Sequence, residues 1–141
     1  MRGEKELLVD ALGRLNGSGL AYMLTGSMAS NYWGIPRTTH DLDFVLLLPP
    51  ADVPRILGAF GSGFLLQPEA VRQALGPPYQ FNAIDEQSSL KIDFRVLRDD
   101  AFERSAFGRR TRVTLFGVPA WVATAEDVIL HKLHWHRLTP S

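Results

Sequence analysis

The stretch TGSMASNYWGIPRTTHDLD, residues 25–43, decides the fold. A Gly-Ser pair opens it and Asp-Leu-Asp closes it, with thirteen residues between Ser27 and Asp41. The preceding run LAYMLT, residues 20–25, is typical of a short buried strand, and SMASNYWG predicts a helix that begins at Ser27. Residues 41–48, DLDFVLLL, predict a second strand that is increasingly buried toward its end. We therefore expect strand, glycine turn, helix, return loop and strand in this order.

The elements outside this stretch alternate between helices and paired strands. Residues 4–16 place Leu7, Leu8, Ala11 and Leu15 on one face of an expected helix. Further helices are expected at 51–60, 68–75 and 99–107, hairpins from 79–84 with 90–97 and from 111–116 with 119–123, and a last helix after the capping-box-like Thr124–Asp127. The order predicts an α+β (mixed α/β) fold with a twisted mixed sheet flanked by helices.

Composition restricts the class of protein before any motif is considered. The chain has 141 residues, 45% of them hydrophobic, which suits a single domain over residues 1–141 with its own core. Fifteen basic and fifteen acidic residues cancel, so no strong overall field favours nucleic acid or a membrane. No apolar run approaches the ~20 residues of a membrane span, and the first residues lack a signal-peptide core. The absence of cysteine agrees with a cytoplasmic location, which we expect.

Two aspartates stand one residue apart at the start of the strand 41–48. Side chains alternate along a strand, so Asp41 and Asp43 share a face. Adjacent carboxylates repel each other unless a positive charge lies between them, and a hard divalent cation such as Mg²⁺ supplies one. Two solvated aspartates held apart by water are the alternative explanation.

A third aspartate lies in the middle of the strand 90–97. Ile92, Phe94 and Val96 alternate there with Lys91, Asp93 and Arg95. Aspartate is disfavoured inside strands, so its position needs a reason. An ion pair with one of the two flanking basic residues is one reason. Convergence on Asp41 and Asp43 from a neighbouring strand is another, and three carboxylates could then hold two metal ions.

The glycine turn has the features of a phosphate site. A turn from strand to helix presents free backbone N–H groups and the positive end of the helix dipole. Gly26 permits close backbone approach and Ser27 adds a hydroxyl donor. A plain turn with a helix N-cap is the simpler alternative, and only the position beside Asp41 and Asp43 favours phosphate.

Taken together, these residues resemble the nucleotidyltransferase superfamily of the polymerase-beta type. The segments GSMASNYWGIPRTTHDLDFVL, SLKIDFRVL and TAEDVILHKL are most similar to its minimal AbiEii/AbiGii toxin-like branch, and the resemblance covers about residues 20–137. In that branch an Arg-x-Thr precedes Asp-x-Asp, which matches Arg37 and Thr39. A capped helix with a lysine follows later, which matches Glu126, Asp127 and Lys132, with alanine at the usual proline position.

The resemblance implies a reaction and a set of residue roles. A nucleoside monophosphate would pass from an NTP such as ATP to a hydroxyl group, with release of pyrophosphate. Asp41, Asp43 and Asp93 would bind two Mg²⁺ or Mn²⁺ ions, and Asp93 would help to deprotonate the attacking hydroxyl. The expected phosphate-binding residues are Gly26, Ser27, Arg37, Thr39, Lys91 and Lys132.

The partners follow from the same resemblance. The acceptor could be tRNA, a protein or a small molecule such as an antibiotic, and a toxin role would imply a cognate antitoxin. Members of the branch continue into a further helical segment after the lysine helix, and we expect this chain to lack it. A non-catalytic binding or regulatory module with the same fold is the alternative function.

Three other features of the sequence carry expectations of their own. His131 and His134 are three residues apart on a helix, a spacing that can bind zinc, although solvated histidines are more common; His136 and His40 have no assigned role. The basic run 104–112 could contact RNA phosphates or form a solvated loop. Tyr32 and Trp33 are expected to pack into the core.

Overall fold

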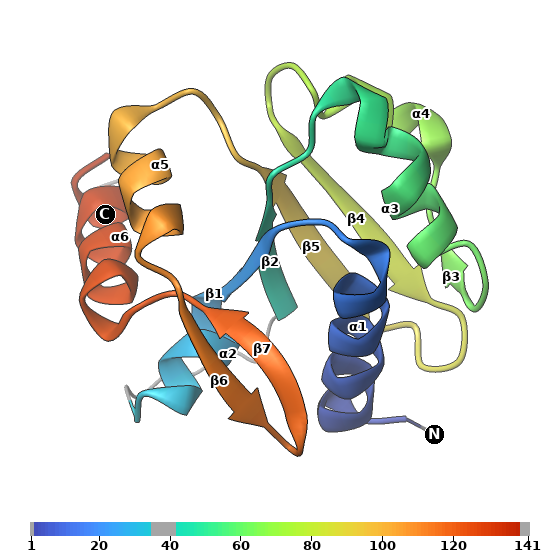
Figure 1. The fold of residues 1–141 in the computed structure, drawn as a ribbon, viewed down its shortest axis with the longest axis horizontal. Helices are drawn as coiled ribbons and strands as arrows, with labels where there is room; N and C mark the ends of the chain where they lie inside the picture. The colour runs from blue at the N-terminus through green and yellow to red at the C-terminus, as the bar shows by residue number, and fades with distance from the viewer. Residues whose placement is uncertain (1, 35–41, 139–141) are drawn as a thin grey trace.

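The computed structural model describes residues 2–34 and 42–138, except for the side chains of Ser27, Lys132 and 134–138. Within these residues the chain forms one mixed sheet with helices on both faces (Figure 1). The strands are β1 (Tyr22–Thr25), β2 (Leu42–Leu46), β3 (Phe64–Leu65), β4 (Gln80–Asp85), β5 (Lys91–Val96), β6 (Thr111–Leu115) and β7 (Val118–Val122). The helices are α1 (Glu4–Ser18), α2 (Gly26–Tyr32), α3 (Val53–Ala59), α4 (Pro68–Gln73), α5 (Ala101–Gly108) and α6 (Ala125–Leu138), with a 3₁₀ turn η1 (Pro50–Asp52).

The sheet has the strand order β3-β4-β5-β2-β1-β7-β6. The central strand β2 pairs antiparallel with β1 and parallel with β5, and β1 also pairs parallel with β7. Two antiparallel hairpins, β4–β5 and β6–β7, complete the two sides. The expected mixed sheet is therefore confirmed, with both hairpins in place.

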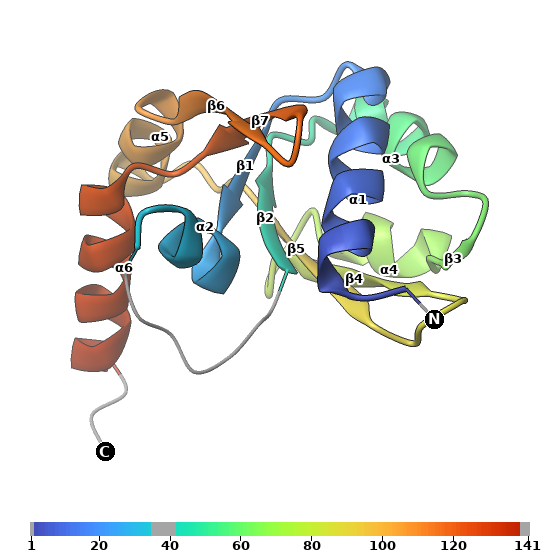
Figure 2. The ribbon, with the colours of Figure 1, turned by 90° about the horizontal axis from the view of Figure 1, so that it is seen from below.

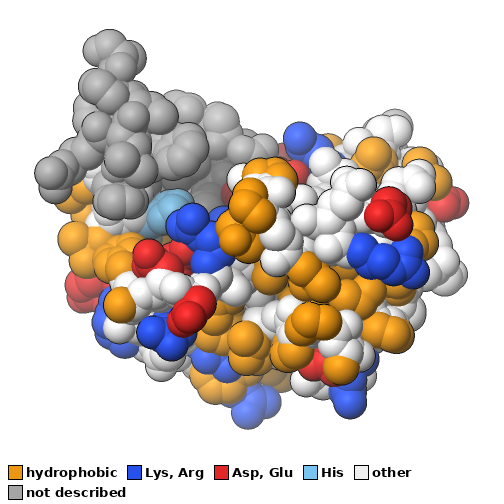
Figure 3. Space-filling model, turned by 90° about the horizontal axis from the view of Figure 1, so that it is seen from above, with side chains coloured by type: hydrophobic (Ala, Val, Ile, Leu, Met, Phe, Trp, Pro, Cys, Tyr) orange, Lys and Arg blue, Asp and Glu red, His pale blue; other side chains and the backbone are white. Residues whose placement is uncertain are grey.

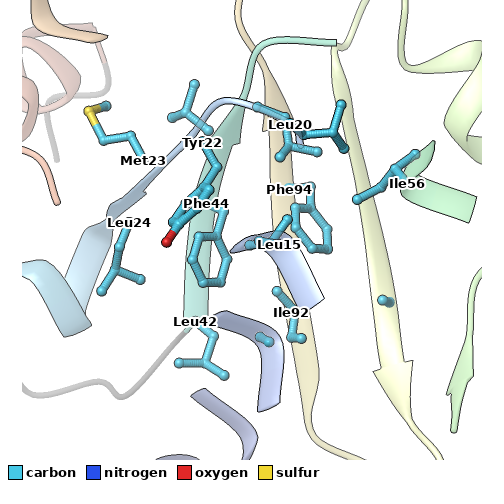
Figure 4. Close-up of a cluster of buried hydrophobic side chains, with 14 of the residues drawn as sticks. Leu15, Leu20, Tyr22, Met23, Leu24, Leu42, Phe44, Ile56, Ile92 and Phe94 are labelled. Carbon is cyan, nitrogen blue, oxygen red and sulfur yellow. The ribbon is translucent and has the colours of Figure 1, made fainter. Parts of the chain in front are cut away.

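The main core lies between the sheet and the helices α1, α3 and α4, which Figure 2 shows on one face. Phe44 of β2 and Phe94 of β5 stack with ring centroids 5.8 Å apart, and Phe94 also stacks on Phe81 of β4. Leu15 of α1 and Ile92 lie beside them (Figure 4). Burial of these large side chains supplies most of the driving force for folding. It also fixes the opposite, partly open face of β2, β5 and β4 as the place for polar side chains.

Most expected elements form within a few residues of their predicted bounds, and the differences have local causes. The predicted helix 51–60 begins as the 3₁₀ turn η1, and Pro54 is accepted because it falls in the first turn of α3. The two-residue strand β3 is absent from the prediction because it lies in a Gly- and Pro-rich segment. The expected burial of Tyr32 and Trp33 is wrong: both rings are more than a third exposed, and the indole Nε1 of Trp33 donates to the Ala123 carbonyl oxygen at 2.8 Å.

The surface agrees with the balanced charge of the chain. On the face in Figure 3, acidic and basic side chains are interspersed with apolar ones, without a continuous patch of either sign among the coloured residues. Within the described part of the chain, every helix is too short or too polar to cross a membrane.

Candidate functional site

Two of the three predicted carboxylates meet across the β2–β5 pair. The parallel register places Asp43 directly opposite Asp93. Their neighbours Phe44 and Phe94 point into the core, so the two aspartates share the other face of the sheet. Both side chains are half-buried, and 41% of the Asp93 side chain is exposed. The convergence expected from the strand alternation is confirmed for this pair.

Gly26 lies against the first of these carboxylates. It follows β1 directly, and the antiparallel β1–β2 register pairs Thr25 with Asp43. Its φ of +67° is in the left-handed region that favours glycine. A Cβ added there would be 2.9 Å from the Asp43 Cγ and 3.0 Å from its Cβ. The glycine is therefore required both by the backbone conformation and by the close approach to Asp43.

A cleft of about 530 Å³ joins these groups on the partly open face of the sheet. Thr25, Asp43, Asp93 and Asn82 line it from β1, β2, β5 and β4 respectively, and His131 lines it from α6. The cleft is large enough for a nucleotide-sized molecule. Lys91 also lines it, and its expected role in binding phosphate stays a prediction.

The basic residues that flank Asp93 have different partners. The Lys91 Nζ lies 4.0 Å from the Asp93 Oδ1, and the Lys91 side chain is 60% exposed, so this ion pair adds little stability. Arg95 instead pairs with Glu103 of α5 at 3.0 Å, and Arg98 shares that carboxylate at 2.7 Å. Burial lowers the pKa of Arg95, and the carboxylates of Glu103 and Asp43 partly offset this effect. The ion-pair explanation for Asp93 is thus limited to the long contact with Lys91.

Several predicted site residues lie outside the described part of the structure. Asp41, Arg37, Thr39 and His40 fall in the segment 35–41. Ser27 is placed as the second residue of α2, and Lys132 lies on α6, but their side chains are not described; the same holds for His134 and His136. These predictions stay predictions.

The donor set that is described fits a hard divalent cation in part. Two half-buried carboxylates face one cleft from adjacent strands, and carboxylate oxygen is the ligand that Mg²⁺ and Mn²⁺ prefer. Among the side chains that the structure describes, no three of His, Cys, Asp or Glu form a metal-binding group. Asp41, the expected third carboxylate of the pattern, lies in the segment that is not described.

Asp127, at the start of α6, has a structural role. Its carboxylate accepts two hydrogen bonds from Arg109, at 2.7 and 3.0 Å, and one from the Thr124 hydroxyl at 2.9 Å. Thr124 in turn accepts from the Asp127 backbone N–H at 3.1 Å, which confirms the predicted helix cap. Arg109 holds the pKa of Asp127 below its ordinary value. This ion pair thus stabilises the start of α6, the helix on which His131 lies at the cleft.

The basic run 104–112 makes contacts within the protein. Arg104 pairs with Asp99 at 3.0 Å, Arg109 with Asp127, and the Arg110 guanidinium lies over the rings of Phe107 and Trp121. At least three of its arginines are therefore engaged internally, which reduces the case for RNA contact.

Several polar residues of the cleft lie outside the site residues predicted from the sequence. Gln80 and Asn82 of β4 line the cleft, and Arg95 forms part of its wall. A smaller cavity of about 150 Å³ adjoins it beneath α5, with Thr25, Arg95 and His131 common to both. Gln80 and Asn82 lie two residues apart in the sequence and so share a face of the strand, but only the β4–β5 register shows that this face lies beside Asp93.

The solved structures most useful for comparison are nucleotidyltransferases and proteins like them. A candidate nucleotidyltransferase of Thermotoga maritima, TM1012, aligns with a TM-score of 0.66 and 13% identity, over 94% of this chain and 84% of that one. The antibiotic-resistance factor ANT(2'')-Ia aligns with a TM-score of 0.65 and 18% identity, over 97% and 74%. An antigenic nucleotidyltransferase-like protein of Paracoccidioides brasiliensis gives 0.60 and 15%, over 98% and 69%.

These similarities establish the fold and nothing finer. Neither a family model nor a curated protein sequence matches the chain. The chain has the nucleotidyltransferase fold, as the sequence resemblance predicts, and the AbiEii/AbiGii-like branch stays a prediction.

Proposed function

We propose that this protein is a metal-dependent nucleotidyltransferase. It would move a nucleoside monophosphate from an NTP to a hydroxyl acceptor and release pyrophosphate. The observation that carries the proposal is the convergence of Gly26, Asp43 and Asp93 on one cleft, in a chain with the nucleotidyltransferase fold. A glycine pressed against one carboxylate, with a second carboxylate opposite, has no evident use in packing the core.

Asp43 and Asp93, with Asp41 as the expected third ligand, would hold divalent ions. When bound, Mg²⁺ or Mn²⁺ neutralises phosphate charge and stabilises the attacking and leaving oxygens. Two neighbouring carboxylates that face solvent are otherwise unfavourable, because like charges repel. The proposal therefore explains why both occupy one row of the sheet.

The chain's own groups would bind and orient the substrate. Gly26 lets the Asp43 carboxylate lie directly against the backbone of the glycine turn, where the phosphates would bind. Lys91, with its exposed ammonium group at the cleft, would neutralise phosphate charge. The half-exposed carboxylate of Asp93 would accept the proton of the attacking hydroxyl.

Isothermal calorimetry with ATP, CTP, GTP and UTP, each with and without Mg²⁺, tests this proposal. We expect at least one nucleotide to bind only with the metal, and Asp43→Asn to weaken that binding by roughly tenfold or more, since even an outer-sphere change at a metal site costs about 10- to 100-fold. Asp52→Asn is the matched control, because Asp52 is a half-buried aspartate of η1 paired with Arg55 and does not line the cleft.

The result also separates the enzyme from a non-catalytic module. Nucleotide binding that is independent of Mg²⁺ and unchanged in Asp43→Asn would favour a binding or regulatory module. No binding of any of the four nucleotides would contradict the proposal.

A further inference from the structure

A single row of residues crosses the sheet at the cleft. Thr25 of β1 is paired with Asp43 of β2, Asp43 with Asp93 of β5, and Asp93 with Asn82 of β4. Neighbouring strands lie about 4.8 Å apart, so the row spans roughly 14 Å from β1 to β4. The glycine turn follows Thr25 at one end, and the amide of Asn82 stands at the other end.

The β4 end of the row presents uncharged polar side chains. Gln80 and Asn82 are exposed and line the cleft, whereas Phe81 and Ala83 between and beside them are buried. The register places Gln80 opposite Arg95 and Asn82 opposite Asp93 on the same face. Side chains paired in this way have Cβ atoms about 4.5–5.5 Å apart. A molecule that contacts Asp93 therefore comes within reach of Asn82.

The direction of the proposed reaction assigns roles to the two ends. Attacking and leaving oxygens lie roughly in line on opposite sides of the phosphorus. With the phosphates at the Gly26 end, the α-phosphorus lies over Asp43 and Asp93, and the acceptor must approach from β4. Its oxygen forms the new bond to the α-phosphorus as its proton passes to Asp93. The bond from the α-phosphorus to the bridging oxygen breaks, and its electron pair leaves with pyrophosphate.

The chemistry of the β4 end indicates what kind of acceptor it fits. Each amide offers two N–H donors and one carbonyl acceptor, which suits hydroxyl groups that both donate and accept. Both β4 side chains that line the cleft are uncharged, and the charge of Asp93 beside them faces Lys91. A polycationic acceptor would favour acidic residues at this place, and a nucleic acid would favour basic ones.

We infer that Gln80 and Asn82 form the acceptor wall of the transferase, and that this wall selects an uncharged, hydroxyl-bearing acceptor such as a sugar ring. The inference rests on the proposed function. It adds two binding residues to the expected set and chooses among the three classes of acceptor that the sequence left open.

Transfer of label from the NTP that binds in calorimetry tests the inference. The acceptor panel contains myo-inositol and methyl riboside as neutral polyols, an aminoglycoside as a polycation, and total tRNA as a polyanion. We expect label in a neutral polyol. Asn82→Leu and Gln80→Met should each raise the acceptor KM about three- to tenfold, the effect of one lost hydrogen bond, with unchanged NTP affinity. Gln73→Met, at the exposed end of α4, should match the wild type.

The possible outcomes distinguish failure of this inference from failure of the proposed nucleotidyltransferase function. The inference is overturned if label enters only the aminoglycoside or tRNA, or none of the four acceptors. It is also overturned if the acceptor KM is unchanged in both wall variants. In each case Mg²⁺-dependent NTP binding through Asp43 would still support the proposed function. Loss of that binding in the wild-type protein overturns both. Thermal melts of the two wall variants check folding, and their exposed positions predict little change.

Discussion

Replacing Gly26 by alanine tests the close approach between the glycine turn and Asp43. A side chain at φ +67° costs about 1–2 kcal/mol in the left-handed region. The new Cβ would also lie 2.9 Å from the Asp43 Cγ, which is 0.5 Å short of the 3.4 Å at which ordinary contact begins. The carboxylate must therefore move by about half an ångström or more. Displacements of ~1 Å at a reacting site can cost about 10²-fold in activity.

Gly117→Ala separates these two effects. Gly117, in the β6–β7 turn, has a φ of +80° and no heavy atom within 4 Å of an added Cβ, so it carries the backbone cost without the contact. We expect thermal melting to show a loss of about 1–2 kcal/mol in Gly117→Ala and at least as much in Gly26→Ala, where the contact with Asp43 adds to the backbone cost. Only Gly26→Ala should weaken Mg²⁺–NTP binding in calorimetry, by roughly tenfold or more. Equal nucleotide affinity in Gly26→Ala and Gly117→Ala would refute the reasoning.

Two further predictions concern the elements that support the cleft. Glu103→Gln removes the nearly buried carboxylate that Arg95 and Arg98 share, and chemical denaturation should show that the free energy of unfolding falls by about 2 kcal/mol. The control Glu69→Gln, at an exposed pair with Arg72, should change it by less than about 0.5 kcal/mol. Equal losses in the two variants would contradict a stabilising role for Glu103. Arg109 and Thr124 lower the pKa of Asp127, so its carboxylate contributes stability that is fully present above the unfolded pKa of about 3.9 and is lost as pH falls through the lower folded pKa. The difference in free energy of unfolding between wild type and Asp127→Asn should therefore stay constant from pH 5 to 7 and shrink below about pH 4. A difference that grows on acidification would contradict a lowered pKa for Asp127.

Much of the sheet could be predicted because its strands have a clear period of two. In the segment 90–97, apolar and polar residues alternate without exception from Leu90 to Val96, so the face that carries Asp93 was fixed by the sequence pattern. The pairing of this strand with β2 was a hypothesis, because parallel partners are set by tertiary contacts that no local pattern reveals. The stack of Phe44 on Phe94 supplies that contact.

Other features depended on information that is not local. The pattern around Tyr32 and Trp33 predicted burial, but α2 ends at Tyr32 and the Trp33 indole reaches the Ala123 carbonyl at the edge of α6 instead. Asn82 looked like an ordinary exposed strand residue until its register placed it opposite Asp93. Gly26 was selected for the phosphate turn, whereas its contact with the Asp43 carboxylate is a tertiary feature that the turn alone does not predict.

A crystal structure with Mn²⁺ and a non-hydrolysable NTP tests the central claim most directly, because anomalous scattering locates the metal independently of the ligand. We expect manganese within roughly 2.0–2.2 Å of carboxylate oxygens from both Asp43 and Asp93, with the triphosphate against the Gly26 backbone. Manganese held by other residues, or a triphosphate at the β4 end of the cleft, would contradict it.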